Sequence, residues 1–210
     1  MTQTLAVDGV TCQAGDVSDA FVFVSGRPSL DLAGTLKWRR SAPEELIGSS
    51  DDAARWAVAA GLVDTAPAVD AGGLAALREL REAVYGLARS RSAELPWEPA
   101  ALALLDRAAG PAPVTPRLQP DGTVRRTGEL PAVLSAVARD AAELLGGPDA
   151  GRIRECAGEE CTRLFVDASR GAPRRWCGMA ECGNRAKAAS YRRRRRTPAA
   201  RAGVPGPDQS

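Results

Sequence analysis

Apolar side chains recur at spacings of three and four residues along much of the first 150 positions, which is the pattern of amphipathic helices. Two stripes predict long helices. The first comprises Leu74, Leu77, Leu80, Val84 and Leu87, and the second comprises Leu130, Val133, Leu134, Val137, Ala141, Leu144 and Leu145. Pro131 suits the first turn of the second helix, and Gly146-Gly147-Pro148 should end it. We therefore expect a domain boundary after Pro148.

Weaker signals predict three shorter helices. Ser49 and Ser50 can cap a helix that holds Trp56 inward and stops at Gly61. A second helix should run from about Glu98 to Ala109, and a helical turn or two should lead from Leu30 to Trp38. Charged residues within these patterns, Asp31 and Asp140, are interpreted as surface or capping side chains.

Strand signals are few and short. Phe21–Val24 and Leu164–Val166 are runs of β-branched and aromatic residues, and each predicts a strand. Pro120-Asp121-Gly122 predicts the turn of a β-hairpin. The expected fold class is therefore mainly α (α+β): a helical first domain with a small hairpin, followed by a small C-terminal module.

These patterns divide the chain into four segments. Residues 1–19 lack periodicity and should be disordered, 20–148 should form the helical domain, and 149–196 should form the C-terminal module. The tail, 197–210, is rich in Pro, Gly and Ala and should also be disordered. We find no internal repeat.

The net charge of +2 conceals a segregation of charge along the chain. Residues 1–150 hold 14 basic and 20 acidic side chains, a net charge of −6, whereas residues 151–196 hold 13 and 5, a net charge of +8. Arg outnumbers Lys by 26 to 2, which codon bias could produce, but such a bias would not concentrate Arg beside cysteines. The basic segment therefore needs an acidic partner.

The amino-acid composition argues against several classes of protein. The chain has no histidine, which removes imidazole-based nucleophile arrangements and every zinc site that needs imidazole, so we expect no enzyme. No run approaches the roughly 18 to 20 apolar residues of a membrane span. We expect a cytoplasmic protein without membrane contact, associated with the nucleoid if it binds DNA.

Four of the five cysteines form two close pairs, Cys156-x4-Cys161 and Cys177-x4-Cys182, separated by fifteen residues. Two turns that each carry two thiolates suit one tetrahedral zinc ion, and four thiolates leave no open position for a catalytic water. The site would be structural, because this module has few apolar residues of its own. An iron–sulfur cluster and buried metal-free thiols are the alternatives. Cys12 stands apart as a free thiol.

Basic residues around and behind the second pair are the candidate nucleic-acid contacts. They are Arg174, Arg175, Asn184, Arg185, Lys187, Arg192, Arg193, Arg194, Arg195 and Arg196. The segment Arg185–Arg192 has a high helix propensity, and the five consecutive arginines at its end would repel one another without a polyanion. Two simpler interpretations remain. The arginines near the cysteines would balance the negative charge of the zinc thiolates, and the run Arg192–Arg196 would be a solvated tail. Few aromatics are available for stacking, so duplex DNA is favoured over RNA.

Sequence motifs around the cysteines resemble a known family. Arg174-Arg175-Trp176-Cys177-Gly178-Met179 and Cys182-Gly183-Asn184-Arg185-Ala186-Lys187 are similar to the CGNR zinc finger, a treble-clef-like module of about 45 residues. Phe21 to Leu145 resembles the ABATE domain of a family of stress-induced transcription regulators, most visibly at Leu77–Ala83. Members of that family usually carry Asn at the position of Gly34. The resemblance implies a mostly helical first domain and a role in DNA binding.

The leading hypothesis is a transcription regulator whose zinc-stabilised basic module binds duplex DNA. The first domain would sense a small molecule or contact a protein, and a homodimer is left open. An alternative is a redox- or zinc-responsive adaptor, in which oxidised thiolates release zinc or the arginine run docks an acidic protein.

Overall fold

A computed structural model describes residues 21–184 and 187–188. The described part is mainly helical and adds three small two-stranded antiparallel sheets, so the predicted fold class is confirmed. Its α-helices are α1 (Pro28–Ala33), α2 (Ser50–Ala59), α3 (Ala71–Ser92), α4 (Pro99–Ala109) and α5 (Leu130–Gly146). The paired strands are β1 (Leu36–Lys37) with β2 (Glu44–Glu45), β3 (Thr115–Leu118) with β4 (Val124–Thr127), and β5 (Ile153–Glu155) with β6 (Leu164–Val166). A short 3-10 helix, η2 (Ala150–Arg152), and a short π-helix, η3 (Met179–Gly183), complete the list.

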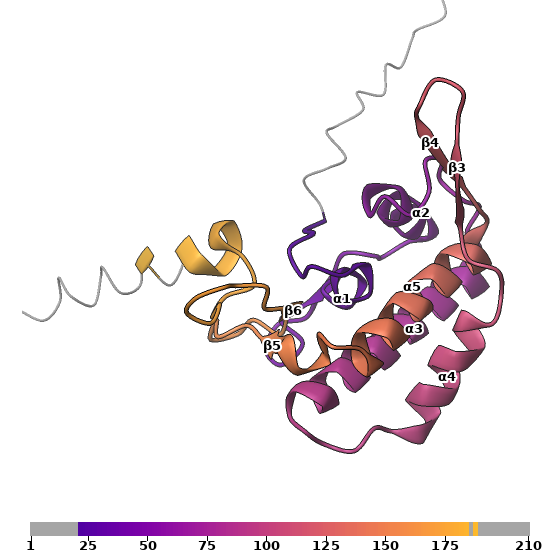
Figure 1. The fold of residues 1–210 in the computed structure, drawn as a ribbon. Helices are drawn as coiled ribbons and strands as arrows, with labels where there is room; N and C mark the ends of the chain where they lie inside the picture. Colours follow the sequence, from indigo (N-terminus) through magenta and orange to yellow (C-terminus); the bar gives the residue numbers. More distant parts are fainter. Residues whose placement is uncertain (1–20, 185–186, 189–210) are drawn as a thin grey trace, which may run out of the picture.

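Helices α3, α4 and α5 lie against one another and form the framework of the molecule (Figure 1). Helices α1 and α2 both contact α3, and α1 also contacts α5. The apolar stripes predicted from the sequence supply the core, where Leu77, Leu87 and Val137 are fully buried. Trp56 of α2 points inward and is fully buried, as predicted.

The helices begin where capping chemistry predicts. The Ser49 hydroxyl accepts from the Asp52 amide and the Asp52 carboxylate accepts from the Ser49 amide, which forms a complete capping box for α2. At the start of α3, the Asp70 carboxylate accepts from the amide of Gly73 at 2.7 Å. A Cβ at Gly73 would clash with the end of the Leu130 side chain, so a larger residue here would require Leu130 of α5 to shift.

Local predictions near the N-terminal end of the described part were only partly right. Helix α1 ends at Ala33 rather than near Trp38, because Leu36–Lys37 pairs with Glu44–Glu45 as a strand. The predicted strand at 21–24 is wrong, since those residues have no partner strand. A run of β-branched and aromatic residues favours a strand, but it could not supply the partner strand that a sheet requires.

The two aspartates singled out in the sequence behave differently. Asp140 accepts from the amide and hydroxyl of Ser29 and forms an ion pair with Arg27, so it caps α1 from α5. The interpretation of Asp31 as a surface residue is wrong: it is 8% exposed and accepts from the Ser25 amide at 2.9 Å. Burial raises the pKa of Asp31.

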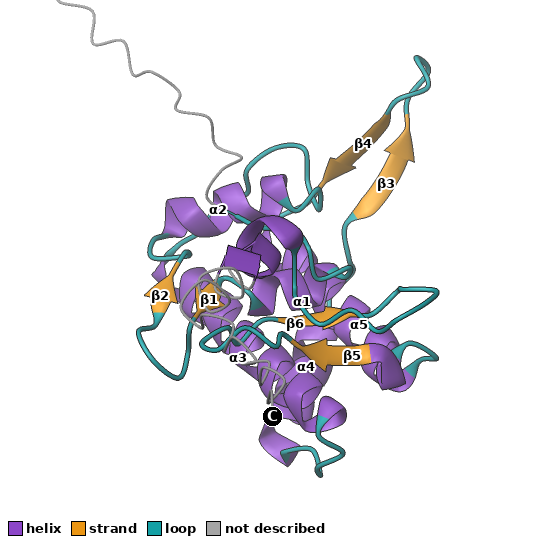
Figure 2. Cartoon of the chain, turned by 90° about the vertical axis from the view of Figure 1, so that its left-hand side faces the viewer, coloured by secondary structure: helices purple, strands orange, loops and turns teal. Residues whose placement is uncertain are grey.

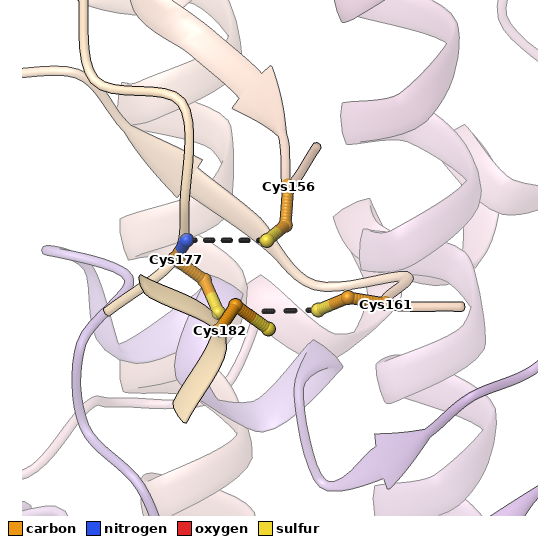
Figure 3. Close-up of side chains that lie close together, drawn as sticks. All are labelled: Cys156, Cys161, Cys177 and Cys182. Carbon is orange, nitrogen blue, oxygen red and sulfur yellow. Dashed lines mark hydrogen bonds between the residues drawn. The ribbon is translucent and has the colours of Figure 1, made fainter. Parts of the chain in front are cut away.

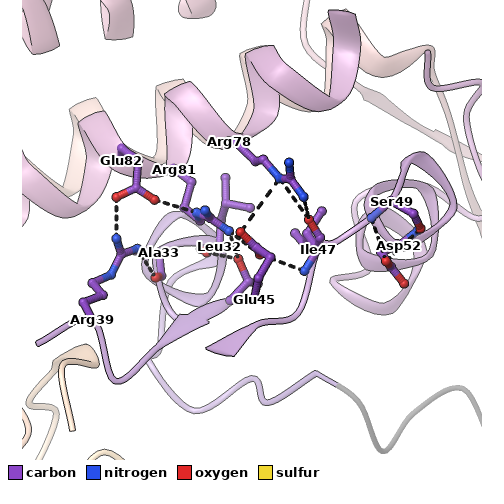
Figure 4. Close-up of polar contacts among 11 residues, drawn as sticks. Leu32, Ala33, Arg39, Glu45, Ile47, Ser49, Asp52, Arg78, Arg81 and Glu82 are labelled. Atoms are coloured by element: carbon purple, nitrogen blue, oxygen red, sulfur yellow. Dashed lines mark hydrogen bonds and ion pairs between the residues drawn. The ribbon is translucent and has the colours of Figure 1, made fainter. Parts of the chain in front are cut away.

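A network of charged side chains ties the β1–β2 loop to α3 (Figure 4). Glu45 accepts from the buried guanidinium of Arg81 at 2.6 Å and from the Ile47 amide at 2.9 Å. Arg39 pairs with Glu82 and lies 4.0 Å from the centre of the Tyr85 ring. The loop is thus held rigidly on α3, with its other side turned to the C-terminal module.

The β5–β6 hairpin belongs to the same hydrophobic core as the helices. Ile153, Leu164 and Val166 are buried in one cluster with residues of α1, α3 and α5. The amide of Val166 also donates to the carbonyl of Ser25 at 2.9 Å, and the amide of Arg39 donates to the Thr162 hydroxyl at 3.3 Å. The hairpin that carries the first cysteine pair is therefore packed onto the helical part.

None of the helices in the described part is both long and apolar enough to cross a membrane. The predicted disordered segments 1–19 and 197–210, together with Cys12, lie outside the described residues, as do residues 185–186 and 189–196 of the predicted C-terminal module.

Candidate metal centre

The four cysteines of the two pairs come from three neighbouring pieces of chain (Figure 3). Cys156 directly follows β5 and Cys161 lies just before β6, so both belong to the loop of the hairpin. Cys177 lies in the segment before η3, and Cys182 lies within it. The first pair thus lies in a hairpin loop, and the strand predicted at Leu164–Val166 is confirmed as one side of that hairpin.

The sulfur atoms of Cys156, Cys161, Cys177 and Cys182 all lie within 4.8 Å of one another. Those of Cys161 and Cys177 are 3.9 Å apart. A tetrahedral site with zinc–sulfur bonds of about 2.3 Å requires sulfur separations of about 3.8 Å. A disulfide would require about 2.05 Å, and all four are free thiols. The geometry fits one tetrahedral metal ion.

Backbone amides near Cys156 are placed to stabilise its thiolate form. The amides of Cys177 and Gly158 point at the sulfur of Cys156, at 3.3 and 3.5 Å. Hydrogen bonds from the Cys161 and Cys177 thiols hold the pKa of Cys156 far below its ordinary value. Hydrogen bonds with the sulfur atoms of Cys156 and Cys161 raise the pKa of Cys177, and burial raises the pKa of Cys182. Four adjacent thiols cannot all ionise without a compensating cation, and a divalent ion would stabilise all four.

A small second core surrounds the cysteines. Phe165 of β6 is fully buried among Cys156, Cys177 and Cys182, and Val24 and Trp176 pack against this group. Crowding is close here: a Cβ at Gly158 would lie 3.1 Å from Cβ of Cys161 and 3.2 Å from the sulfur of Cys182. This position therefore favours a residue without a side chain.

Arg174, one of the predicted nucleic-acid contacts, is part of this support. Its guanidinium lies 4.4 Å from the centre of the Phe165 ring and donates to the carbonyls of Trp176 at 2.7 Å, Val24 at 3.0 Å and Cys177. Counting charges in the sequence could not reveal these partners. The Arg174 side chain fastens the second cysteine pair to the start of the described chain.

The other predicted contacts are placed differently. Arg175, Asn184 and Lys187 are exposed, and the guanidinium of Arg175 lies 5.2 Å from the centre of the Trp176 ring. Arg185 and the run Arg192–Arg196 lie outside the described residues.

Sequence reasoning missed the contacts between the β1–β2 loop and the cysteine loop. Arg40 pairs with Glu155, the residue directly before Cys156, and Ser41 donates to Glu160, the residue directly before Cys161. Arg163 is 7% exposed, and its Nη1 has no hydrogen-bond partner among the described residues. A Cβ at Gly34 would lie 3.2 Å from Nε of Arg163, so this glycine leaves room for the guanidinium.

Two family models match this chain. Residues 26–148 match the ABATE family, described as "Putative stress-induced transcription regulator", and residues 152–195 match the CGNR zinc finger. A comparison with curated proteins gives no match. Both matched families are regulatory types rather than enzymes. The second match and the four clustered thiols identify a site for one zinc ion. Since the first match spans more than half of the 210 residues, the chain belongs to the ABATE family and carries a CGNR zinc finger behind that domain.

Proposed function

We propose that this regulator binds duplex DNA through its zinc finger, with Cys156, Cys161, Cys177 and Cys182 as the ligands of a structural zinc ion. The observation that carries the proposal is the convergence of four sulfur atoms within 4.8 Å directly before the most basic stretch of the chain. Four thiolates fill a tetrahedral site, so the metal would bind no substrate and activate no water.

The proposed DNA surface begins on the exposed side of the finger. Arg175, Asn184 and Lys187 are exposed, and Arg185 and the run Arg192–Arg196 lie near them in sequence. Arg174 belongs to this surface through its position, but its guanidinium is engaged with backbone carbonyls, so its role would be to hold the finger in shape. The net charge of +8 over residues 151–196 is the attraction that phosphates would meet.

The domain division 20–148 and 149–196 remains part of the proposal, with the first domain receiving a small molecule or a protein signal. The shared core and the contacts of the β1–β2 loop with the cysteine loop supply a physical connection between them. A homodimer is compatible with this arrangement. Zinc-loaded protein of the full sequence would then act in the cytoplasm, at the nucleoid.

Binding to labelled duplex DNA across a salt series tests this proposal. Each guanidinium–phosphate contact should contribute a slope of about −0.9 to the plot of log binding constant against log salt. Replacing Arg192–Arg196 by alanine should reduce the magnitude of the slope by up to about 4.5, if all five arginines contact phosphates. Replacing the exposed Arg89 and Arg107 of α3 and α4 is the control and should leave it unchanged. A binding constant insensitive to salt would contradict the proposal.

A redox- or zinc-responsive role is a second candidate, because Cys161 is the least buried of the four and lies 3.9 Å from the sulfur of Cys177. Peroxide could oxidise two thiolates to a disulfide, with its own reduction to water, and so release the metal. Stoichiometric zinc release by mild peroxide, followed by loss of DNA binding and recovery after reduction, would support this role. A site that keeps zinc under these conditions would argue for a purely structural ion.

A further inference from the structure

The hairpin arm, defined here as residues Thr115–Thr127, projects from the body of the molecule (Figures 1 and 2). Strands β3 and β4 pair from Thr115 with Thr127 to Leu118 with Val124. All four residues of β3 and three of the four in β4 are exposed, so the arm contributes no strand residue to the core. A two-stranded hairpin is marginal in water unless something else supports it.

Support comes from both ends of the arm. At its base, the amide of Asp64 donates to the Arg126 carbonyl at 2.9 Å, and the Arg126 amide donates to the Asp64 carboxylate at 2.6 Å. At its tip, the Asp121 carboxylate accepts from the amide and the hydroxyl of Thr123 at 2.9 and 2.7 Å. Gly122 adopts a φ of 81°, which the tight turn requires. The arm is thus a preformed element.

The charge on the arm is unfavourable in isolation. Arg117 stands directly opposite Arg125, and like charges in a cross-strand pair destabilise a hairpin. Thr115 and Thr127 lie on the same face, two positions away along each strand. Within the described part of the chain, the side chains of Arg117 and Arg125 have no ion pair or hydrogen bond. This face carries two uncompensated guanidiniums flanked by hydroxyls.

The opposite face offers little to a protein partner. Its large exposed apolar side chains are Leu118 and Val124, which form one cross-strand pair beside the exposed Pro116. A stable protein interface buries about 800 Å² on each partner, far more than two such side chains provide. Phosphate groups match the first face better, because they accept from guanidinium and hydroxyl groups alike and relieve the repulsion between the arginines.

We propose that the hairpin arm is a second DNA-contacting element, in which Arg117 and Arg125 bind backbone phosphates of the duplex held by the zinc finger. The proposal rests on the function proposed above, and it extends the contact to the helical domain. The proposed contact adds affinity by neutralising phosphate charge, and this contribution is what the salt slope measures.

The test uses the full zinc-loaded chain and a labelled duplex several helical turns long. In R117A/R125A, the magnitude of the salt slope should fall by about 1.8, and binding at about 0.1 M salt should weaken by roughly 10- to 60-fold. The charge-matched control R89A/R107A removes two exposed arginines from α3 and α4 and should keep the wild-type slope. R117K/R125K should restore most of the slope, since it keeps both charges.

The outcomes separate this inference from the function on which it rests. If the wild type binds DNA and R117A/R125A keeps its slope, the arm proposal is overturned while the zinc-finger proposal stands. If R117A/R125A instead changes the sedimentation of the free protein and leaves the slope intact, the arm contacts a second copy and the proposal is also overturned. Failure of the wild type to bind DNA overturns both. The unfolding midpoint of R117A/R125A should be no lower than that of the wild type, since the variant removes a repulsive cross-strand pair. R117Q/R125Q removes both charges while keeping longer side chains, and it should lower the magnitude of the salt slope in the same way.

Discussion

The packing of the β5–β6 hairpin into the helical core predicts that a substitution in the finger destabilises the helical domain. Leu164 of β6 is 1% exposed and lies in one cluster with buried residues of α1, α3 and α5. Leu164→Ala removes its isobutyl group from that cluster and leaves a cavity between the hairpin and the helices.

The expected magnitude follows from the burial of Leu164. Complete burial of leucine gives a loss of about 2–5 kcal/mol on truncation to alanine. For a protein of this size, each kcal/mol shifts the unfolding midpoint by about 2–4 °C, so a loss of about 3 kcal/mol lowers it by about 6–12 °C. Leu118→Ala is the matched control: Leu118 is 77% exposed, and the same truncation there should change the free energy of unfolding by less than about 0.5 kcal/mol.

Thermal unfolding followed by far-ultraviolet circular dichroism is the assay, because its signal comes mainly from α1 to α5. Metal content must be equal in all samples, since bound zinc shifts the midpoint by itself. An unchanged helical midpoint in Leu164→Ala, with the finger alone loosened, would refute the shared core.

Three further predictions follow from the described contacts. Glu45→Gln should cost about 1–2 kcal/mol, because it leaves Arg81, whose side chain is 4% exposed, without its 2.6 Å carboxylate partner. Burial opposes ionisation of Glu45, but the Arg81 hydrogen bond outweighs it and lowers its pKa; the carboxylate therefore stabilises the fold above about pH 4.5, and this stability is lost as pH falls through the lowered pKa. Urea titrations at several pH values should show that acid-side loss in the wild type and not in Glu45→Gln. Arg174→Lys should lower zinc affinity in a chelator competition, since lysine cannot both stack on Phe165 and reach three carbonyls. Removing zinc with a chelator should lower the unfolding midpoint reversibly, and a midpoint indifferent to the chelator would count against a structural ion.

Signals that act over short stretches of sequence predicted most of the helices. The capping box at Ser49 and Asp52 depends on residues three positions apart, and the apolar stripes of α3 and α5 depend on residues three and four positions apart. Both can therefore be predicted from the sequence alone. The candidate metal site could be predicted for the same reason, because the two cysteines of each pair are close together in the sequence.

Contacts between distant segments could not be predicted in this way. Val24 and Arg174 are 150 positions apart, and only the folded chain shows that the guanidinium donates to that carbonyl. Asp31 was interpreted as a surface residue because it is charged, although its neighbours Leu30 and Leu32 are fully buried. A charged residue within an apolar run could have suggested a buried hydrogen bond, which the Ser25 amide supplies.

Metal stoichiometry measured by native mass spectrometry tests the account most directly. The wild type should carry one zinc ion per chain, Cys177→Ser should lose it or bind it far more weakly, and Cys12→Ser should keep it, because the four clustered thiols of the described part already fill a tetrahedral site. A metal-free wild type that still protects the β5–β6 amides from hydrogen exchange would contradict the account, as would a Cys177→Ser variant that binds zinc as tightly as the wild type.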